Sequence, residues 1–358
     1  MKYEYWFANI QKLNCKRKLK IRQVIKTAEE LYYIEETELK QYIEDESERA
    51  LILNSASAWN VEKEYQKMVE KGVWFVTMMQ ENYPNCLRQI PSPPYALFVK
   101  GSLPDENKRT IAIVGARECT PYGEVMAEEF AGTLARHGVQ IVSGMARGVD
   151  GAGQLGALEQ GGSSFGVLGC GVDVCYPREQ IELYMKLQEQ GGIISEFPIG
   201  TNPLPQHFPA RNRIISGFAD TVLVIEAKEK SGSLITADMA LEQGKDVYAL
   251  PGPINSQLSM GCNRLIRQGA GILLEPEELL VELGICHEKE KKKESQIKIL
   301  LETTEELVYS CLGLQPKNLE SLYKMTKIES SQLLGVLMRL QLKGVVREVS
   351  KNYYVRVK

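Results

Sequence analysis

Motifs for metal, redox and membrane function are scarce in this sequence of 358 residues. It has only three histidines, and none of its eight cysteines forms a C-x-x-C pair. We therefore expect no metal site and interpret the cysteines as reduced, packed thiols. No apolar run approaches the roughly 18 residues of a membrane helix, and the first residues lack the apolar core of a signal peptide. These absences predict a cytoplasmic protein without a membrane partner.

Signatures of nucleotide-dependent and hydrolytic enzymes are also missing. The sequence has no G-x-x-x-x-G-K-[ST] loop and no G-x-S-x-G elbow, and Gly169-x-Gly171 is not followed by the third glycine of a dinucleotide fingerprint. We expect no cofactor and no catalytic residues. Asp150, Asp173 and Glu226 could act as acid or base, but we interpret Asp150 as a helix cap and Glu226 as a partner of an arginine.

Charge is nearly balanced overall but uneven along the chain. The 43 Lys+Arg and 46 Asp+Glu give a net charge of -3, which excludes a polycationic nucleic-acid condenser. Residues 1–60 sum to zero, residues 61–296 to -7 and residues 297–358 to +4. A nucleic-acid site in the middle of the chain would therefore depend on a few local cations rather than on bulk attraction.

The first 65 residues have the pattern of a small helical domain. Seven cations and no acid fall between Lys12 and Lys26, and apolar residues recur there at helical spacing. The basic block could contact nucleic acid, but we favour a solvated helix face.

Residues 72–285 alternate short apolar runs with helical patterns. This alternation predicts an α/β fold, namely a doubly wound, mainly parallel sheet with right-handed crossovers. The expected strands are residues 73–77, 96–99, 111–114, 140–142, 165–168, 193–195, 221–225, 247–250 and 272–274.

The C-terminal part has a different pattern. Residues 287–296 are highly charged and are interpreted as a linker. Residues 297–358 then follow the order helix, turn, helix and hairpin, which predicts a winged-helix-like domain. From Lys298 to Lys358 there are ten cations and six acids. This element order occurs in DNA readers and in protein-docking modules, and the sequence leaves both open.

Candidate binding residues cluster where the predicted strands end. Ligands of an open parallel sheet bind beyond the carboxyl ends of the strands, where the next helices begin. Thr120 is the expected N-cap and Pro121 the first residue of the helix after the 111–114 strand. The glycines, hydroxyls, amide, ring and arginines at these junctions predict an anion-binding edge suited to phosphate. The candidates are Gly115, Arg117, Ser143, Gly144, Arg147, Gly148, Phe208, Arg211, Asn212, Arg213, Gly232 and Ser233. The junction at residues 169–173 offers no cation.

Seven ordered blocks in this region resemble the DNA-processing protein A (DprA, or Smf) family. They are IAIVGAR, IVSGMARGVDGAGQLGAL, VLGCGVDVCYP, IISEFPIG, FPARNRIISG, VLVIEAKEKSGSLITADMALEQGKDVYALPG and GCNRLIRQGA. The resemblance covers about residues 72 to 275. It implies an extended Rossmann-like domain, with an N-terminal helical, SAM-like domain and a C-terminal winged helix as attachments.

The resemblance also implies a function. Family members bind single-stranded DNA without cutting it, form homodimers and help load the RecA recombinase in natural transformation. Arg117 matches the motif arginine that contacts DNA phosphate in the family. Two further family motifs have a basic position that matches Arg147, and a ring and arginines that match Phe208, Arg211 and Arg213. One departure is that Gly153-Gln154 stands where the family usually has Ala-His. Any property that depends on that histidine is in doubt here.

Two other classes of function compete with a single-strand DNA mediator. One is a nucleotide-processing enzyme of the related fold group, such as a phosphoribohydrolase. Those enzymes look like P-G-G-x-G-T where this chain has PGPIN at residues 251–255. The other is a regulator that binds duplex DNA through residues 298–358.

Overall fold

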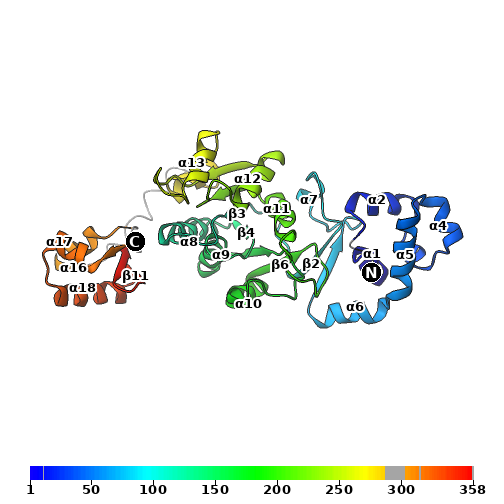
Figure 1. Cartoon of the computed structure of the whole chain (residues 1–358), viewed down its shortest axis with the longest axis horizontal. Helices are drawn as coiled ribbons and strands as arrows, with labels where there is room; N and C mark the ends of the chain where they lie inside the picture. Colours follow the sequence, from blue (N-terminus) through cyan, green and yellow to red (C-terminus); the bar gives the residue numbers. More distant parts are fainter. Residues whose placement is uncertain (11, 287–302, 314–315, 357–358) are drawn as a thin grey trace.

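A computed structural model describes residues 1–10, 12–286, 303–313 and 316–356. Its centre is a nine-stranded sheet with helices on both faces (Figure 1). The predicted linker at residues 287–296 lies outside the described residues. The division into domains stays a prediction, because one cluster of buried side chains runs from the N-terminal helices into the sheet.

Each of the nine predicted strands is present. The strand order is β1-β2-β6-β5-β4-β3-β7-β8-β9. Strand β2 pairs antiparallel with β1 and β6, and the other pairs are parallel, which confirms the doubly wound, mainly parallel sheet. The strands are β1 (Trp74–Thr77), β2 (Ala96–Gly101), β3 (Thr110–Val114), β4 (Gln140–Ser143), β5 (Ser164–Val167), β6 (Gly191–Ser195), β7 (Thr221–Val224), β8 (Asp246–Ala249) and β9 (Gly271–Ile272).

Strand β3 explains why the central strands are apolar throughout. Successive side chains of a strand point to opposite faces of the sheet. Ile111 and Ile113 pack with helices α8 (Pro121–Arg136), α9 (Val149–Glu159) and α14 (Pro276–Glu282). Ala112 and Val114 pack on the other face with α11 (His207–Phe218), α12 (Gly232–Glu242) and α13 (Met260–Arg267). Helix α10 (Ile181–Gln190) leads into β6, and two short helices complete this part, α7 (Asn85–Arg88) and η1 (Arg178–Gln180).

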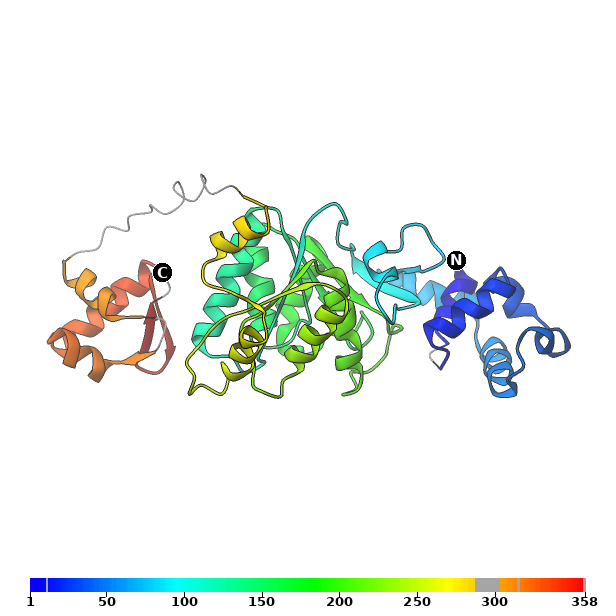
Figure 2. The ribbon, with the colours of Figure 1, turned by 90° about the horizontal axis from the view of Figure 1, so that it is seen from above.

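Six helices precede the sheet and pack beside β1 and β2 (Figure 2). The Tyr5 ring lies 5.4 Å from that of Phe75 on β1 and 6.0 Å from that of Phe98 on β2. These contacts join the N-terminal helices to one edge of the sheet. The helices are α1 (Lys2–Ala8), α2 (Cys15–Val24), α3 (Ala28–Tyr33), α4 (Glu36–Tyr42), α5 (Glu46–Ala58) and α6 (Val61–Glu70).

The solvated-face interpretation of the basic block is wrong for two residues. Lys18 and Arg22 are buried on the side of α2 that packs against α1. The Lys18 Nζ donates a hydrogen bond to the Ala8 carbonyl oxygen, and Arg22 pairs with Glu4 at 2.6 Å. A helix of ten residues must turn one face to its neighbours, and here that face includes two cations as well as the apolar residues.

The C-terminal residues have the predicted order of elements. Helices α16 (Thr303–Cys311), α17 (Leu319–Thr326) and α18 (Ser330–Leu342) are followed by the hairpin β11 (Val346–Ser350) and β12 (Tyr353–Arg356). Strand β10 (Lys317–Asn318) adds to β12 and completes a three-stranded sheet. The assignment as a winged helix rests on this order and stays a prediction. Within the described ranges, no helix is long and apolar enough to cross a bilayer.

Candidate nucleic-acid interface

A cleft lies at the carboxyl edge of the sheet, between the loops that follow β3 and β7. Helix α8 leads the chain from β3 towards β4, whereas α12 leads from β7 towards β8, so the chain diverges at this point. Such a switch point leaves a crevice in open α/β sheets. The cleft consists of a cavity of about 580 Å³ and a neighbouring cavity of about 310 Å³. Both are lined by Arg117, Ala146, Tyr176, Phe208 and Arg211.

The loop after β3 presents Arg117 to both cavities. Arg117 is exposed, and its guanidinium lies over the Phe208 ring at 5.6 Å from the centroid. Gly115 allows close packing here, because a Cβ on it would lie within 2.7 Å of the Val149 side chain. The loop therefore holds a cation beside an aromatic ring and leaves the guanidinium accessible.

Helix α8 begins as predicted, with the Thr120 side chain as N-cap and Pro121 in the first turn. The predicted role of Glu226 is wrong. Its carboxylate accepts hydrogen bonds from the Thr120 backbone N–H at 2.8 Å and from the Thr120 hydroxyl at 2.6 Å. Glu226 thus fixes the start of α8, because β7 lies directly beside β3.

The Ser143 hydroxyl and the Gly144 N–H, at the end of β4, both donate hydrogen bonds within the protein. The Ser143 hydroxyl donates to the Ile113 carbonyl oxygen at 2.6 Å, and the Gly144 N–H donates to Asp150 Oδ2 at 3.1 Å. The expectation that Ser143 and Gly144 offer donors to a ligand is therefore not supported. The predicted helix cap is also wrong, since Gly148 is the N-cap of α9 and Asp150 lies within the helix. Burial raises the pKa of Asp150, although attraction by Arg211 opposes this.

Gly148 allows two loops to pack closely, and its neighbour Arg147 is exposed to the cleft. Gly148 has a φ of +73°, and a Cβ there would lie 2.4 Å from the Ala116 carbonyl oxygen. The loops after β3 and β4 can therefore touch only through a glycine. Arg147 is exposed and lines the smaller cavity.

Gln154, which stands where the family usually has a histidine, supports the loop after β4. Gln154 is fully buried, accepts a hydrogen bond from the Met145 N–H at 3.1 Å and donates to the Phe165 carbonyl oxygen at 3.0 Å. Met145 has a φ of 53°, which is uncommon for a residue with a side chain. The Gln154 amide thus ties this unusual turn to β5.

Arg211 on α11 is buried beneath the cleft. Its Nη1 donates to the Gly144 carbonyl oxygen at 2.8 Å and also to the Val167 carbonyl oxygen. Its Nε donates to Asn212 Oδ1 at 3.0 Å, and the Asn212 amide donates in turn to the Gly232 carbonyl oxygen at 3.2 Å. Burial lowers the pKa of Arg211 to about 10. Arg211 and Asn212 therefore join the loops of the cleft to each other.

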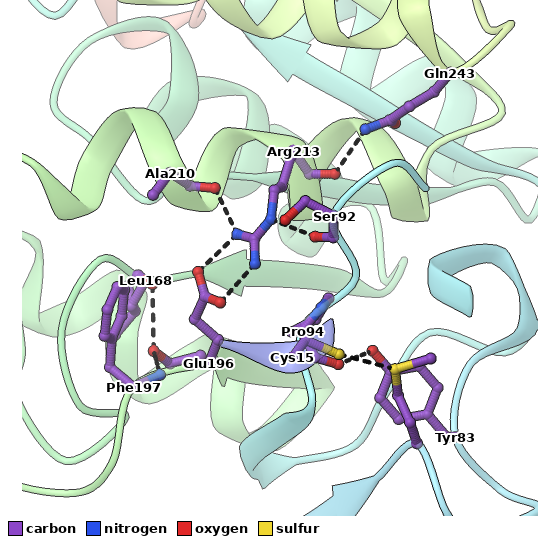
Figure 3. Close-up of polar contacts among 12 residues, drawn as sticks. Cys15, Tyr83, Ser92, Pro94, Leu168, Glu196, Phe197, Ala210, Arg213 and Gln243 are labelled. Atoms are coloured by element: carbon purple, nitrogen blue, oxygen red, sulfur yellow. Dashed lines mark hydrogen bonds and ion pairs between the residues drawn. The ribbon is translucent and has the colours of Figure 1, made fainter. Parts of the chain in front are cut away.

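Arg213 lies outside the cleft, which contradicts its predicted grouping with the other candidates. Figure 3 shows its guanidinium facing Glu196, with hydrogen bonds of 2.7 and 2.6 Å to the two carboxylate oxygens. It also donates to the carbonyl oxygens of Ser92 and Ala210, both at 2.6 Å. Arg211 and Arg213 are two residues apart on a helix, so their side chains point to different sides.

The first turn of α12, after β7, lines the larger cavity with Gly232 and Ser233. Ser231 is the N-cap of α12 and accepts a hydrogen bond from the Ser233 N–H at 3.2 Å. The two hydroxyl oxygens lie 2.5 Å apart. Lys228 and Lys230, which we did not select from the sequence, are exposed and line the same cavity. They could have been found, because they follow a predicted strand end.

The junction after β5 contributes more than the sequence indicated. The Tyr176 and Phe208 ring centroids lie 5.3 Å apart at an interplanar angle of 37°. Arg178 is exposed and lines the smaller cavity. Residues 169–173 contain no cation, as expected, but Tyr176 and Arg178 lie just beyond them, where the chain returns to the cleft.

Unpaired cations distinguish the cleft electrostatically. Among the described residues, no ion pair involves the five exposed cations that line it. They are Arg117, Arg147, Arg178, Lys228 and Lys230. Two exposed carboxylates, Glu118 and Glu179, also line the cleft. The cations remain available to an anionic ligand.

The fold and the cleft define an α/β protein of the Rossmann-like class with a cation-lined cleft at the switch point of its sheet. The model of the family "DNA recombination-mediator protein A" matches residues 74–284. The chain belongs to this family, whose members include proteins named DprA and Smf.

Curated relatives support this assignment. Protein Smf of Escherichia coli is 48% identical over 204 residues, which cover 57% of this chain and 54% of that protein. The match thus spans about half of the E. coli protein. DNA processing protein DprA of Bacillus subtilis is 40% identical over 215 residues, covering 60% of this chain and 72% of that protein.

Solved structures agree with the fold. DprA of Streptococcus pneumoniae superposes with a TM-score of 0.68 at 32% identity, covering 79% of this chain and 98% of that chain. DprA of Helicobacter pylori, described for its single-stranded DNA binding mode, has a TM-score of 0.53 at 29% identity. It covers 60% of this chain and 97% of its own.

Proposed function

We propose that the cleft binds single-stranded DNA and that the protein is a recombination mediator rather than an enzyme. The observation that carries the proposal is the set of unpaired, exposed cations around the neighbouring rings of Tyr176 and Phe208. Cations that follow the backbone and a ring that stacks on a base are the usual means of binding single strands of any sequence. The H. pylori relative binds single-stranded DNA, according to its description.

In this proposal Arg117 and Arg147 contact phosphates, and Phe208 stacks on a base. Gly115 and Gly148 allow the segments of the cleft to pack closely, and Gly232 leaves open space for the bound DNA strand. Arg211 and Asn212 shape the cleft from below, while Arg213 takes no part in binding. Arg178, Lys228 and Lys230 extend the row of cations beyond the residues predicted from the sequence.

The biological role extends the proposal further. We infer that the protein protects incoming single strands, acts as a homodimer and loads the RecA recombinase during natural transformation. Two copies would offer two clefts, which lengthens the bound strand and raises the avidity. A strand-exchange assay with the recombinase and a DNA-coating protein tests the loading role.

The C-terminal unit does not favour the alternative of a duplex DNA regulator. Helix α18 is the element expected in the major groove. Arg339 on this helix and Lys343 at its C-cap both pair with Glu305, at 3.1 and 2.6 Å. Leu334, Met338 and Leu342 are exposed on the same helix. A helix that reads base edges needs polar groups at those positions.

The decisive experiment compares two exposed arginines at opposite ends of β3. Arg117 follows the strand, and Arg109 precedes it. We expect Arg117→Ala to weaken binding of a labelled oligothymidine about tenfold, across all sequences, and to reduce the salt slope by about 0.7. Arg109→Ala should bind like the wild type. Equal affinities of the two variants, measured by fluorescence anisotropy, would contradict the proposed site. Stronger binding of duplex DNA or of free nucleotides would favour the alternative functions.

A further inference from the structure

A second groove lies on the other side of α11 from the cleft, between the N-terminal helices and the sheet. Its volume is about 490 Å³. Gln206 and His207 line this groove, whereas the next residue, Phe208, lines the cleft. The first turn of α11 therefore separates the two.

Lys18 is a buried cation that lines this groove without an acidic partner. It is only 4% exposed, and its Nζ donates to the Ala8 carbonyl oxygen at 2.7 Å. The Nζ also lies 5.3 Å from the centroid of the Tyr95 ring. Of the ion pairs among residues that the structure describes, none includes Lys18. An ammonium has three donors, and the hydrogen bond to Ala8 uses one of them.

The acidic residue that lines this groove already pairs with another cation. Glu196 also lines the groove, but both of its carboxylate oxygens accept hydrogen bonds from Arg213 (Figure 3). Because Glu196 and Arg213 neutralise each other, the protonated form of Lys18 gives these three residues a net charge of one positive unit. Burial lowers the pKa of Lys18 to about 7, which reflects the cost of an uncompensated ammonium.

The local backbone also favours an anion. Asn14, Cys15 and Lys18 line the groove, and they form the N-cap and first turn of α2. The first N–H groups of a helix lack acceptors within the helix, and its dipole attracts negative charge. The Asn14 side chain accepts from the Arg17 N–H at 2.9 Å and so satisfies only one of these donors. A lysine at a helix N-terminus suits phosphate, which it can bind as a point charge.

We propose that this groove is a phosphate-binding site with Lys18 as its principal contact. The phosphate can belong to a free compound or to a nucleotide of a bound strand. The second source rests on the proposed function, because a strand that leaves the cleft would reach the groove by crossing the first turn of α11.

The test uses the full chain with ¹³C-labelled lysine side chains. Inorganic phosphate is titrated at constant ionic strength while the Lys18 Cε resonance, assigned with Lys18→Met, is followed. We expect a saturable shift of this resonance and a higher pKa of Lys18. The resonance of Lys20, exposed on the same helix, should respond only as other surface lysines do. A Lys18 response no larger than that of Lys20 would overturn the site.

Three variants separate phosphate binding from folding. Gln206→Glu places a carboxylate at an exposed position of the groove, so it should weaken phosphate binding at least fivefold without disturbing the fold. Phosphate should raise the Tm of the wild type and of Lys20→Met, but not that of Lys18→Met. An equal rise in all three proteins would count against the proposal.

A separate experiment tests whether the phosphate belongs to a bound DNA strand. A long oligothymidine that binds the cleft should shift the Lys18 resonance, whereas one of a few nucleotides should not. If inorganic phosphate shifts the resonance and no oligonucleotide does, the site stands and takes a free phosphate compound. Because the phosphate titration needs no DNA, its result does not depend on the outcome of the Arg117→Ala experiment.

Discussion

The arginines on the loops of the cleft and the arginines on helix α11 have opposite surroundings. Arg117 and Arg147 lie on loops after strands, are exposed and belong to no ion pair among the described residues. Arg211 and Arg213 lie on α11, where carbonyl and carboxylate oxygens of other segments surround their guanidiniums. The comparison teaches that arginines predicted for the same role can remain exposed and unpaired on a loop or hold distant segments together on a helix. The acceptors around each guanidinium decide which.

The largest expected effect concerns Arg211. We expect Arg211→Met to lower the free energy of unfolding by about 3–5 kcal/mol, because it leaves Asp150 and two carbonyl oxygens buried without their cation. Arg117→Met should change it by less than about 0.5 kcal/mol. Urea unfolding of both variants checks this. A stable Arg211→Met protein that had lost DNA binding would instead make Arg211 a binding residue.

Substitution of Arg213, like that of Arg211 and unlike that of Arg117, should lower the stability of the protein. We expect Arg213→Ala to cost about 1.5–3 kcal/mol of stability, because charge-assisted hydrogen bonds to Glu196 are lost. Its affinity for single-stranded DNA, measured by anisotropy under conditions where it is folded, should equal that of the wild type. Glu196→Gln gives the matched control, since it weakens the same pair from the other side. A selective loss of DNA affinity in Arg213→Ala would break the comparison.

Phe208 tests whether the exposed arginines act together with a ring. We expect Phe208→Ala to weaken single-strand binding by about 1–3 kcal/mol, with a shallow effect on the salt slope, because stacking involves no counterion release. Phe208→Tyr should retain most of the affinity. If instead the salt slope falls as it does in Arg117→Ala, Phe208 serves only to position Arg117.

Lys18 sharpens the comparison with a cation that is buried and has no acidic partner. Its folded-state pKa of about 7 lies below the ordinary 10.5, so the unfolded chain binds more protons between these values. Stability should therefore rise with pH above about pH 7, by at most about 1.4 kcal/mol per pH unit. The free energy of unfolding of the wild type minus that of Lys18→Met, measured at about pH 7 and pH 8.5, isolates this effect. A difference that does not change with pH would contradict it.

Much of the fold could be predicted because its signals are local. The nine apolar runs are each a few residues long, and each forms a strand within one or two residues of the expected bounds. The capped start of α8 was predicted for the same reason, since Thr120 and Pro121 are neighbours in the chain. The N-terminal basic block was misjudged, because its pattern of charge does not reveal which face of α2 packs against α1.

The site was predicted in outline for a topological reason. Parallel strands end at one edge of the sheet, so residues after β3, β4 and β7 meet there whatever their distance along the chain. Tyr176 and Arg178 were missed because the chain returns to this edge only after a longer loop.

The sequence by itself determined the strands, their order along the chain and the edge of the sheet at which the glycines and arginines gather. Only the tertiary structure decided which polar groups stay free. Arg213 donates to Glu196 and to Ser92, 17 and 121 residues away in the chain. Glu226 accepts from Thr120, 106 residues away. Hydrogen bonds of this kind depend on segments that the fold brings together, and no local pattern records them.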